Sequence, residues 1–82
     1  MTRMAQCCCG SLRADARTEP EIVAMCHCTE CQRRTGSTFG VSSYFKVSDV
    51  EVSGPSTSYV RTGTSGNKVE THFCPTCGST VY

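Results

Sequence analysis

Three cysteines close together in the first half of the chain have a spacing that is typical of a metal site. Residues 26–31 read Cys-His-Cys-Thr-Glu-Cys. Thiolates at this Cys-x-Cys-x-x-Cys spacing can surround one cation, and Zn²⁺ takes cysteine sulfur at about 2.3 Å in tetrahedral geometry. Three sulfurs leave a fourth position, which another cysteine would close into a structural site and which water or substrate would occupy in a catalytic one. The segment predicts zinc at Cys26, Cys28 and Cys31.

Two further groups of cysteines lie near the ends of the chain. The first is Cys7-Cys8-Cys9-Gly10, where alternation along an extended segment would point Cys7 and Cys9 the same way. Cys8 would then face the other side, as a small hydrophobic side chain or a free thiol. Gly10 suits a tight turn with positive φ, which would let the backbone fold around a metal. The second group, at residues 74–78, is Cys-Pro-Thr-Cys-Gly, a zinc knuckle in which two sulfurs share one cation over a tight turn.

Seven sulfurs remain when Cys8 is set aside, and this number suggests one site of four and one of three. Cys74 and Cys77 could join the first pair, or could join the central cysteines as in a zinc ribbon. The ribbon would leave residues 32–73, a gap of 42, between the two pairs, whereas the usual gap is about 15 to 20. We therefore expect the first and last pairs to form one site that clamps the two ends of the chain.

Short strands separated by turn signals must position these cysteines. We expect a weak strand at 11–18, with Leu12, Ala14 and Ala16 on one face, and a more apolar strand at 21–25 that leads into Cys26. These two strands are expected to form an antiparallel hairpin. A short helical turn at 29–35, ending at Gly36, would carry Cys31 back toward the other two central thiols.

The second half of the chain also has the composition of short strands. We expect strands at 40–47, 50–52, 57–62 and 68–73, a turn at 63–67, and a short strand at 79–82. Turn signals about every ten residues favour an all-β fold, a small sandwich or open barrel. We treat residues 1–82 as a single domain, whose small core needs additional stabilisation, for example by a bound zinc ion.

Composition excludes several other classes of protein. The chain carries 8 Lys and Arg against 7 Asp and Glu, and its only basic run is Arg33-Arg34, so no nucleic-acid partner is expected. No membrane partner is expected either, because no apolar stretch approaches membrane-spanning length. Residues 1–6 lack an apolar run of the secretory kind, which favours the cytoplasm. In that reducing compartment, clustered cysteines are metal ligands more often than disulfides.

The motifs together resemble the glutathione-dependent formaldehyde-activating enzyme family, which includes the centromere protein V-like proteins. They are, in order, Cys7-x-Cys9-Gly10, Cys26-His27-Cys28-x-x-Cys31-x-Arg33-x-x-Gly36 and Phe73-Cys74-x-x-Cys77-Gly78. The resemblance covers nearly the whole chain and implies a β-tent fold. Family members usually continue for several strands beyond the last knuckle, so the end at Tyr82 leads us to expect a fold that is truncated at its C-terminus.

The resemblance also implies two zinc sites and a reaction. The structural zinc would be held by Cys7, Cys9, Cys74 and Cys77, and the second zinc by Cys26, Cys28 and Cys31. The implied reaction joins formaldehyde to glutathione and gives S-(hydroxymethyl)glutathione, which makes the family's enzyme a carbon-sulfur lyase. Glutathione would thus be the substrate, and the open central zinc would lower the pKa of its thiol or polarise the carbonyl.

Four polar residues beside the cysteines have two interpretations each. Arg33 and Arg34 could bind the carboxylates of the substrate, since a guanidinium matches a carboxylate with two hydrogen bonds, or could be solvated charges. His27 could relay protons but fits a packing role better, because an extended segment would turn its ring away from the sulfurs. Glu30 is expected to be an ordinary polar residue of the helical turn.

The alternative function is a non-catalytic zinc-binding scaffold, because a fold alone does not determine function. The two hypotheses differ in the fourth ligand of the central zinc. Water or an external thiol there would support an enzyme, whereas Cys8 or His72 would close the site and support a scaffold. Complete cysteine sets make His72 unnecessary as a ligand. The sequence does not predict an oligomeric state.

Overall fold

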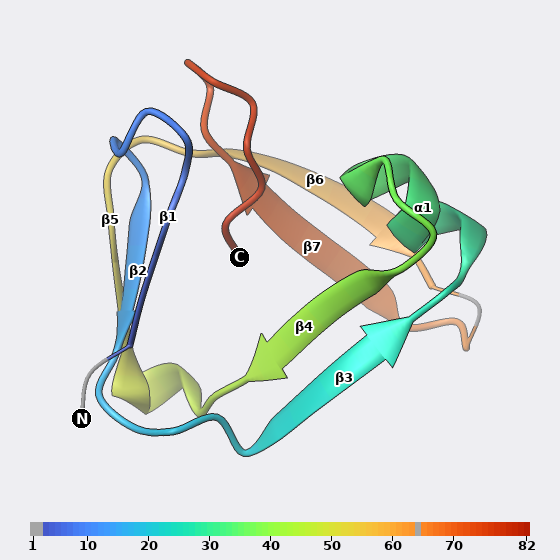
Figure 1. The fold of residues 1–82 in the computed structure, drawn as a ribbon, viewed down its shortest axis with the longest axis horizontal. Helices are drawn as coiled ribbons and strands as arrows, with labels where there is room; N and C mark the ends of the chain where they lie inside the picture. Colours follow the sequence, from blue (N-terminus) through green and yellow to red (C-terminus); the bar gives the residue numbers. More distant parts are fainter. Residues whose placement is uncertain (1–2, 64) are drawn as a thin grey trace.

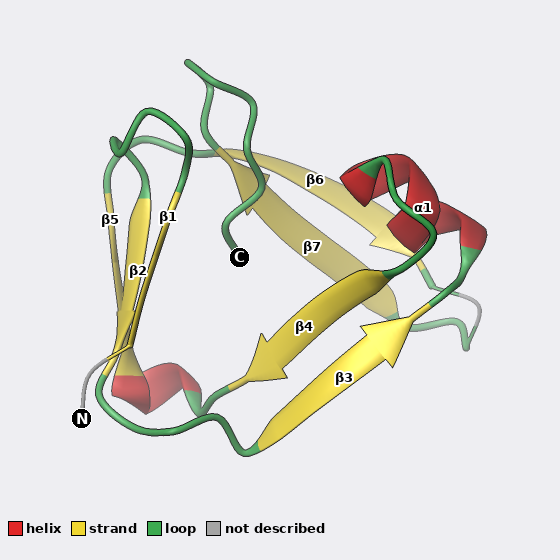
Figure 2. Ribbon diagram, viewed as in Figure 1, coloured by secondary structure: helices red, strands yellow, loops and turns green. Residues whose placement is uncertain are grey.

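Three small antiparallel sheets and one short helix make up the protein. The computed structural model describes residues 3–63 and 65–82, in which the sheets face one another and α1 lies over one end of β6 and β7 (Figures 1 and 2). The elements are β1 (Arg3–Gln6), β2 (Arg13–Ala16), β3 (Ile22–Cys26), α1 (Thr29–Thr35), β4 (Gly40–Tyr44), the 3-10 turn η1 (Val47–Asp49), β5 (Val50–Ser53), β6 (Thr57–Thr62) and β7 (Lys68–Phe73). The predicted all-β class is confirmed, with no closed barrel among the described strands.

The first sheet has the order β1-β2-β5, with every pair antiparallel. Ala14 pairs with Val52 and Ala16 with Val50, so the small residues of β2 lie beside branched ones. The alternation predicted for residues 11–18 is only partly visible in the burial, since Leu12 and Ala16 are buried but Ala14 is half-buried like the polar residues beside it. Three segments connect this sheet to the rest of the fold: one after β2, one before β5 and one after β5.

The hairpin predicted between 11–18 and 21–25 is wrong. β2 pairs with β1, while β3 pairs with β4, where Cys26 lies opposite Gly40. Two local reversals explain this choice. The turn at residues 7–10 folds β1 back on β2, and α1 reverses the chain so that β4 returns beside β3. Each strand therefore pairs across a compact reversal rather than across Glu19-Pro20.

The third sheet is the β6–β7 hairpin, whose arms are joined by the predicted turn at 63–67. Residue 64 lies outside the described residues, but the backbone N–H of Gly63 donates to the Asn67 carbonyl at 2.7 Å and closes the turn. Beyond β7, the strand predicted at 79–82 is reduced to a single bridge between Phe73 and Thr80. No helix in the described part of the chain is long and apolar enough to cross a membrane.

The buried core is small and rich in sulfur. Its central cluster consists of Cys7, Leu12 and Cys74, with Val81 packed against it. Cys31 and Ala16 are the other buried apolar residues of the described chain. Many large apolar side chains, among them Ile22, Met25 and Tyr44, keep more than half of their surface exposed. The stability of the fold therefore depends on the interactions that its cysteines make.

Candidate metal centres and the adjoining cavity

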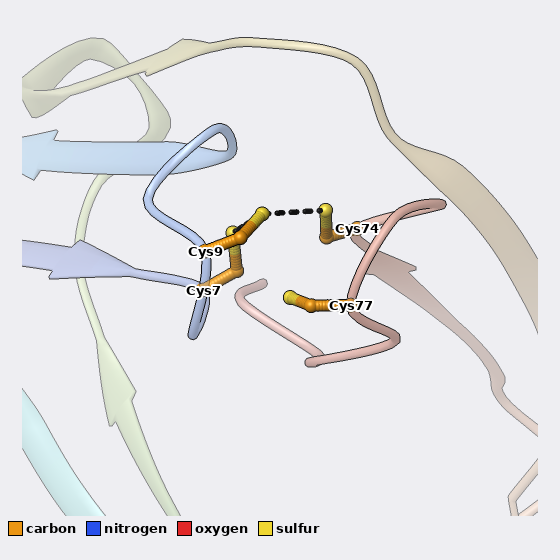
Figure 3. A group of neighbouring side chains, drawn as sticks. All are labelled: Cys7, Cys9, Cys74 and Cys77. Atoms are coloured by element: carbon orange, nitrogen blue, oxygen red, sulfur yellow. Dashed lines mark hydrogen bonds between the residues drawn. The ribbon is translucent and has the colours of Figure 1, made fainter.

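Four cysteine sulfurs from the two ends of the chain converge in one cluster, here called the four-sulfur cluster. Cys7 and Cys9 come from the loop after β1, Cys74 and Cys77 from the loop after β7, and Figure 3 shows the four side chains pointing toward one another. Their sulfur atoms all lie within 4.8 Å of one another. The Sγ–Sγ distances Cys7–Cys9 and Cys9–Cys74 are both 3.6 Å. A tetrahedron of sulfurs with about 2.3 Å to a central Zn²⁺ has edges of ~3.8 Å, so the donors fit zinc.

A tight turn brings Cys7 and Cys9 together. Residues 7–9 are not extended as expected, because the N–H of Gly10 donates to the Cys7 carbonyl at 3.0 Å and closes a turn. The tight turn predicted at Gly10 is confirmed, with a φ of 81° that favours glycine. Cys8 is exposed and belongs to neither cluster of the described cysteines. Its sulfur accepts a hydrogen bond from the Ser79 hydroxyl at 3.1 Å. The Cys8 side chain thus points away from those of Cys7 and Cys9 because of this turn, and not because of strand alternation as expected.

Two serine hydroxyls that the sequence analysis did not select contact the four-sulfur cluster. Ser11 Oγ lies 3.1 Å from Cys9 Sγ and 3.2 Å from Cys74 Sγ. Ser79 Oγ lies 3.5 Å from Cys77 Sγ. The only sequence signal for them is that each follows a Cys-Gly pair, at residues 9–10 and 77–78.

These hydrogen bonds favour thiolates in the cluster. The Ser11 hydroxyl, followed by the Cys77 backbone, lowers the pKa of Cys74 to about 7. The Ser79 hydroxyl and backbone lower the pKa of Cys77 to about 5. Ser11 also favours the thiolate of Cys9, but the neighbouring sulfurs of Cys7 and Cys74 outweigh it, so the pKa of Cys9 is raised. Because zinc binds the thiolate, the cluster is suited to hold it near neutral pH.

The second cluster, here called the three-sulfur cluster, consists of Cys26, Cys28 and Cys31. Cys26 ends β3, Cys28 is the N-cap of α1 and Cys31 lies within α1, and the three sulfurs lie within 4.8 Å of one another. The predicted helical turn at 29–35 is confirmed, and it ends at Gly36 with a φ of 71°. No fourth Cys, His, Asp or Glu of residues 3–63 and 65–82 joins this cluster.

The thiols of the three-sulfur cluster differ strongly in their acidity. The backbone N–H of Cys31 donates to Cys28 Sγ at 3.4 Å and lowers the pKa of Cys28 to about 7. The Cys28 and Cys26 sulfurs, together with burial, raise the pKa of Cys31 to about 11. Three sulfurs suit a borderline cation such as zinc, but the buried Cys31 must first lose its proton.

The polar residues considered beside the clusters have other contacts. The His27 ring lies against the Phe39 ring, with centroids 5.8 Å apart, which fits the packing role. Glu30 Oε1 lies 3.5 Å from Arg33 Nη1. The His72 ring stacks on Tyr82 and pairs with Glu70 at 2.8 Å. His27 and His72 both lie outside the two sulfur clusters.

Arg34 lies close to the three-sulfur cluster because Gly40 has no side chain. A Cβ atom built on Gly40 would come within 2.7 Å of Arg34 Nη2 and 3.4 Å of Cys31 Cβ. Gly40 is also the strand partner of Cys26. The missing side chain therefore leaves room for a guanidinium beside two of the cysteines.

Two cavities meet beside this guanidinium. One of about 370 Å³ lies between α1 and the β6–β7 hairpin, and is lined by Glu30, Arg33, Arg34, Tyr59, Arg61, Thr71, Phe73, Gly78 and Thr80. The other, of about 1050 Å³, is bordered by all three sheets and by Cys26 and Cys31. Arg34 and Arg61 line both cavities. Nothing in the sequence pointed to Arg61, which is 30 positions after Cys31 on another element.

A family model described as glutathione-dependent formaldehyde-activating enzyme matches residues 2–82 of the chain. The match covers all the cysteines of both clusters and both arginines of α1. No curated protein matches the chain.

Proposed function

Because the chain belongs to the glutathione-dependent formaldehyde-activating enzyme family, we propose that it joins formaldehyde or a similar small carbonyl compound to glutathione. In this reaction a C–S bond forms between the thiol sulfur and the carbonyl carbon, and the thiol proton ends on the former carbonyl oxygen. No oxidant or reductant is needed. The product with formaldehyde is S-(hydroxymethyl)glutathione, and the activity is that of a carbon-sulfur lyase. The cytoplasm suits this proposal, since thiols stay reduced there.

We assign different roles to the two clusters. The four-sulfur cluster would hold a structural zinc on Cys7, Cys9, Cys74 and Cys77. Two of these cysteines, Cys7 and Cys74, belong to the buried core, and the four sulfurs have the spacing of a closed tetrahedral site. Cys26, Cys28 and Cys31 would hold the zinc that takes part in the reaction. When bound there, zinc would supply Lewis acidity, which favours a thiolate over a thiol and polarises a carbonyl.

The residues around the three-sulfur cluster orient the substrate in this proposal. Cys26 and Cys31 border the larger cavity, so a small molecule can approach them from the interior of the protein. Arg33 and Arg34 lie on α1 shortly after Cys31 and would offer positive charge to the carboxylates of glutathione. Holding the thiol in a fixed place would increase the rate by making its encounter with the carbonyl effectively intramolecular.

One observation carries the proposal. In a member of this family, three cysteine sulfurs have no fourth ligand among the described side chains, and two of these cysteines, Cys26 and Cys31, line a cavity that arginines line as well. A purely structural site has no need of a cavity at its sulfurs or of basic groups beside it. The four-sulfur cluster, by comparison, borders neither cavity through any of its four cysteines.

Calorimetry and NMR on the zinc-loaded protein test the proposed function. Glutathione is titrated into wild type and into Cys28→Ser, and formation of S-(hydroxymethyl)glutathione is followed above the spontaneous background. We expect wild type to bind glutathione and accelerate the reaction, and Cys28→Ser to lose one zinc, most of the binding and the acceleration. The four-sulfur cluster should keep the variant folded. Equal binding by both proteins, or binding by neither, would contradict the proposal and favour the scaffold.

A further inference from the structure

Two of the arginines at the junction of the cavities have no partner anion. Among the described residues, Arg33 pairs with Glu30, Arg3 with Glu19 and Arg13 with Asp15, and Arg17 donates to a backbone carbonyl. Arg34 and Arg61 make no ion pair and no side-chain hydrogen bond within the described chain. These two positive charges are therefore available to a ligand.

The positions of the two guanidinium groups are set by different elements. Arg34 projects from α1 against Gly40, beside the three-sulfur cluster. Arg61 lies near the end of β6, which passes beneath α1 (Figure 1), and it is half-buried. In the register of the hairpin, Tyr59 is opposite Thr71 and Arg61 opposite Val69, so alternation places Arg61 on the same face as Tyr59, Thr71 and Phe73. That face is the one that lines the smaller cavity.

A site of this kind selects for a carboxylate. Two guanidinium forks can each donate two hydrogen bonds to a planar carboxylate, and charge-assisted bonds are roughly twice as strong as neutral ones. Arg61 is half-buried, so its charge loses part of its hydration, and a bound anion would offset that cost. Arg34 is exposed and contributes its charge alone. Among the described residues, the smaller cavity is lined by one side-chain carboxylate, that of Glu30, which is paired with Arg33. The larger cavity is lined by Glu70, which is paired with His72.

We infer that Arg34 and Arg61 together bind a carboxylate of the thiol substrate, and that they restrict the proposed reaction to thiols that carry an acidic group. The inference rests on the proposed function and makes Arg61 a positioning residue for it. It also distinguishes the two neighbouring arginines of α1, because Arg33 has a carboxylate partner in Glu30 and Arg34 has none among the described residues. Neutral thiols of similar reactivity would bind without benefit from either residue.

Titration calorimetry on the zinc-loaded chain tests this inference. Glutathione, S-methylglutathione and 2-mercaptoethanol are titrated into wild type, Arg61→Gln, Arg61→Lys and the control Arg17→Gln, whose arginine lines neither cavity. We expect Arg61→Gln to weaken binding of glutathione and S-methylglutathione about 10-fold or more, as loss of a charged hydrogen-bond partner does. Binding of 2-mercaptoethanol should not change. The affinity of Arg61→Lys for glutathione should lie between those of wild type and Arg61→Gln, because lysine keeps the charge but cannot donate two parallel hydrogen bonds.

The outcomes separate the inference from the function on which it rests. If wild type binds and converts both free thiols, and Arg61→Gln leaves every affinity unchanged, the inference is overturned and the proposed function stands. If wild type binds no thiol, the proposed function fails and the inference fails with it. Circular dichroism and zinc content must match wild type in each variant, and a misfolded Arg61→Gln would leave Arg61→Lys to decide between the same outcomes.

Discussion

The two sulfur clusters differ in how their thiols are held at the level of single atoms. In the four-sulfur cluster, hydroxyl groups of Ser11 and Ser79 contact the sulfurs, and the pKa of Cys77 falls to about 5. In the three-sulfur cluster, the buried Cys31 receives no such donor, and its pKa rises to about 11 because of the neighbouring sulfurs. A zinc ion must therefore displace a proton from Cys31 at any pH at which the protein works.

This difference predicts the order in which the two clusters lose zinc on acidification. The thiol of Cys77 has a lowered pKa, so it stays a thiolate and can bind metal at lower pH. The thiol of Cys31 has a raised pKa, so in the absence of metal it stays protonated over the whole pH range of the acidification. Each proton that metal must displace weakens binding by about tenfold per pH unit. We expect the three-sulfur cluster to release zinc first as the pH falls from 7 toward 4. A chromogenic chelator that binds the released zinc would record two steps, one for each cluster.

The Cys28→Ser variant identifies which step belongs to which cluster. It lacks one ligand of the three-sulfur cluster and should show only the step at lower pH. If Cys28→Ser instead abolishes the step at lower pH, the assignment of the acid-resistant zinc to the four-sulfur cluster is wrong. A single step in wild type would mean that the acidity of the individual thiols does not control release.

Sequence reasoning at this scale worked where spacing alone carries the signal. The Cys-x-Cys and Cys-x-x-Cys patterns place sulfurs in reach of one another whatever the rest of the chain does, so the cysteines that the structure brings together were selected from the sequence. Ser11, Gly40 and Arg61 were not, because their roles depend on contacts between distant segments. Ser11 acts on Cys74 across 63 positions, and no local pattern can encode such a contact.

At the scale of elements, local signals again succeeded and long-range pairing did not. The helix 29–35 was predicted with its observed bounds, since a polar run followed by Gly36 is a local signal. The partner of β3 was predicted wrongly, because strand pairing depends on which reversal brings two edges together. The positive φ predicted at Gly10 is confirmed, because a glycine after the cysteines is a local turn signal. The extended backbone predicted for the three cysteines is wrong, because three consecutive cysteines have no pattern that distinguishes a strand from a turn.

The loop after β5 offers a test of how elements support the four-sulfur cluster. A Cβ atom on Gly54 would lie 1.9 Å from the Ser11 carbonyl oxygen, and Gly54 has a φ of 96°. Gly66 has a similar φ of 88° but no atom within 4 Å of such a Cβ. We expect Gly54→Ala to lower the free energy of unfolding by about 1–3 kcal/mol more than Gly66→Ala does, because only the former adds a clash to the backbone strain.

Urea unfolding of the zinc-loaded variants measures this difference. Gly54→Ala should also weaken zinc binding at the four-sulfur cluster, because the clash displaces the backbone of the residue whose hydroxyl contacts Cys9 and Cys74. The Gly66→Ala variant is the matched control, since it has the same side chain and nearly the same backbone strain. Equal losses of stability in the two variants would show that the close approach of Gly54 to Ser11 does not hold in solution.

For the whole molecule, the four-sulfur cluster takes the place of a conventional hydrophobic core. The central buried group contains two cysteines and a single leucine, and much of the large apolar surface of the sheets stays exposed. An 82-residue chain gains little stability from burial of this extent. The cluster also joins the loop after β1 to the loop after β7, so one ion would hold the N-terminal and C-terminal parts of the fold together.

The last prediction follows from this arrangement: Cys74→Ser should unfold the protein, whereas Cys28→Ser should not. Binding of zinc at a structural site supplies on the order of 10 kcal/mol of folding free energy, more than a small core can replace. Cys74 is fully buried and belongs to both the four-sulfur cluster and the core. Cys28 lies at the start of α1, outside that core. Native mass spectrometry would count zinc ions per chain, and circular dichroism would record the melting transition.

Cys8→Ser is the matched control for Cys74→Ser, because it makes the same chemical change at an exposed cysteine that belongs to neither cluster. We expect Cys8→Ser to keep two zinc ions and the melting temperature of wild type, since the one hydrogen bond of its sulfur within the described chain is from the Ser79 hydroxyl. Cys28→Ser should keep one zinc ion and a cooperative transition. If Cys74→Ser retains the zinc content and melting temperature of wild type, the four-sulfur cluster is not what holds the fold, and the exposed apolar faces of the sheets must be stabilised in another way.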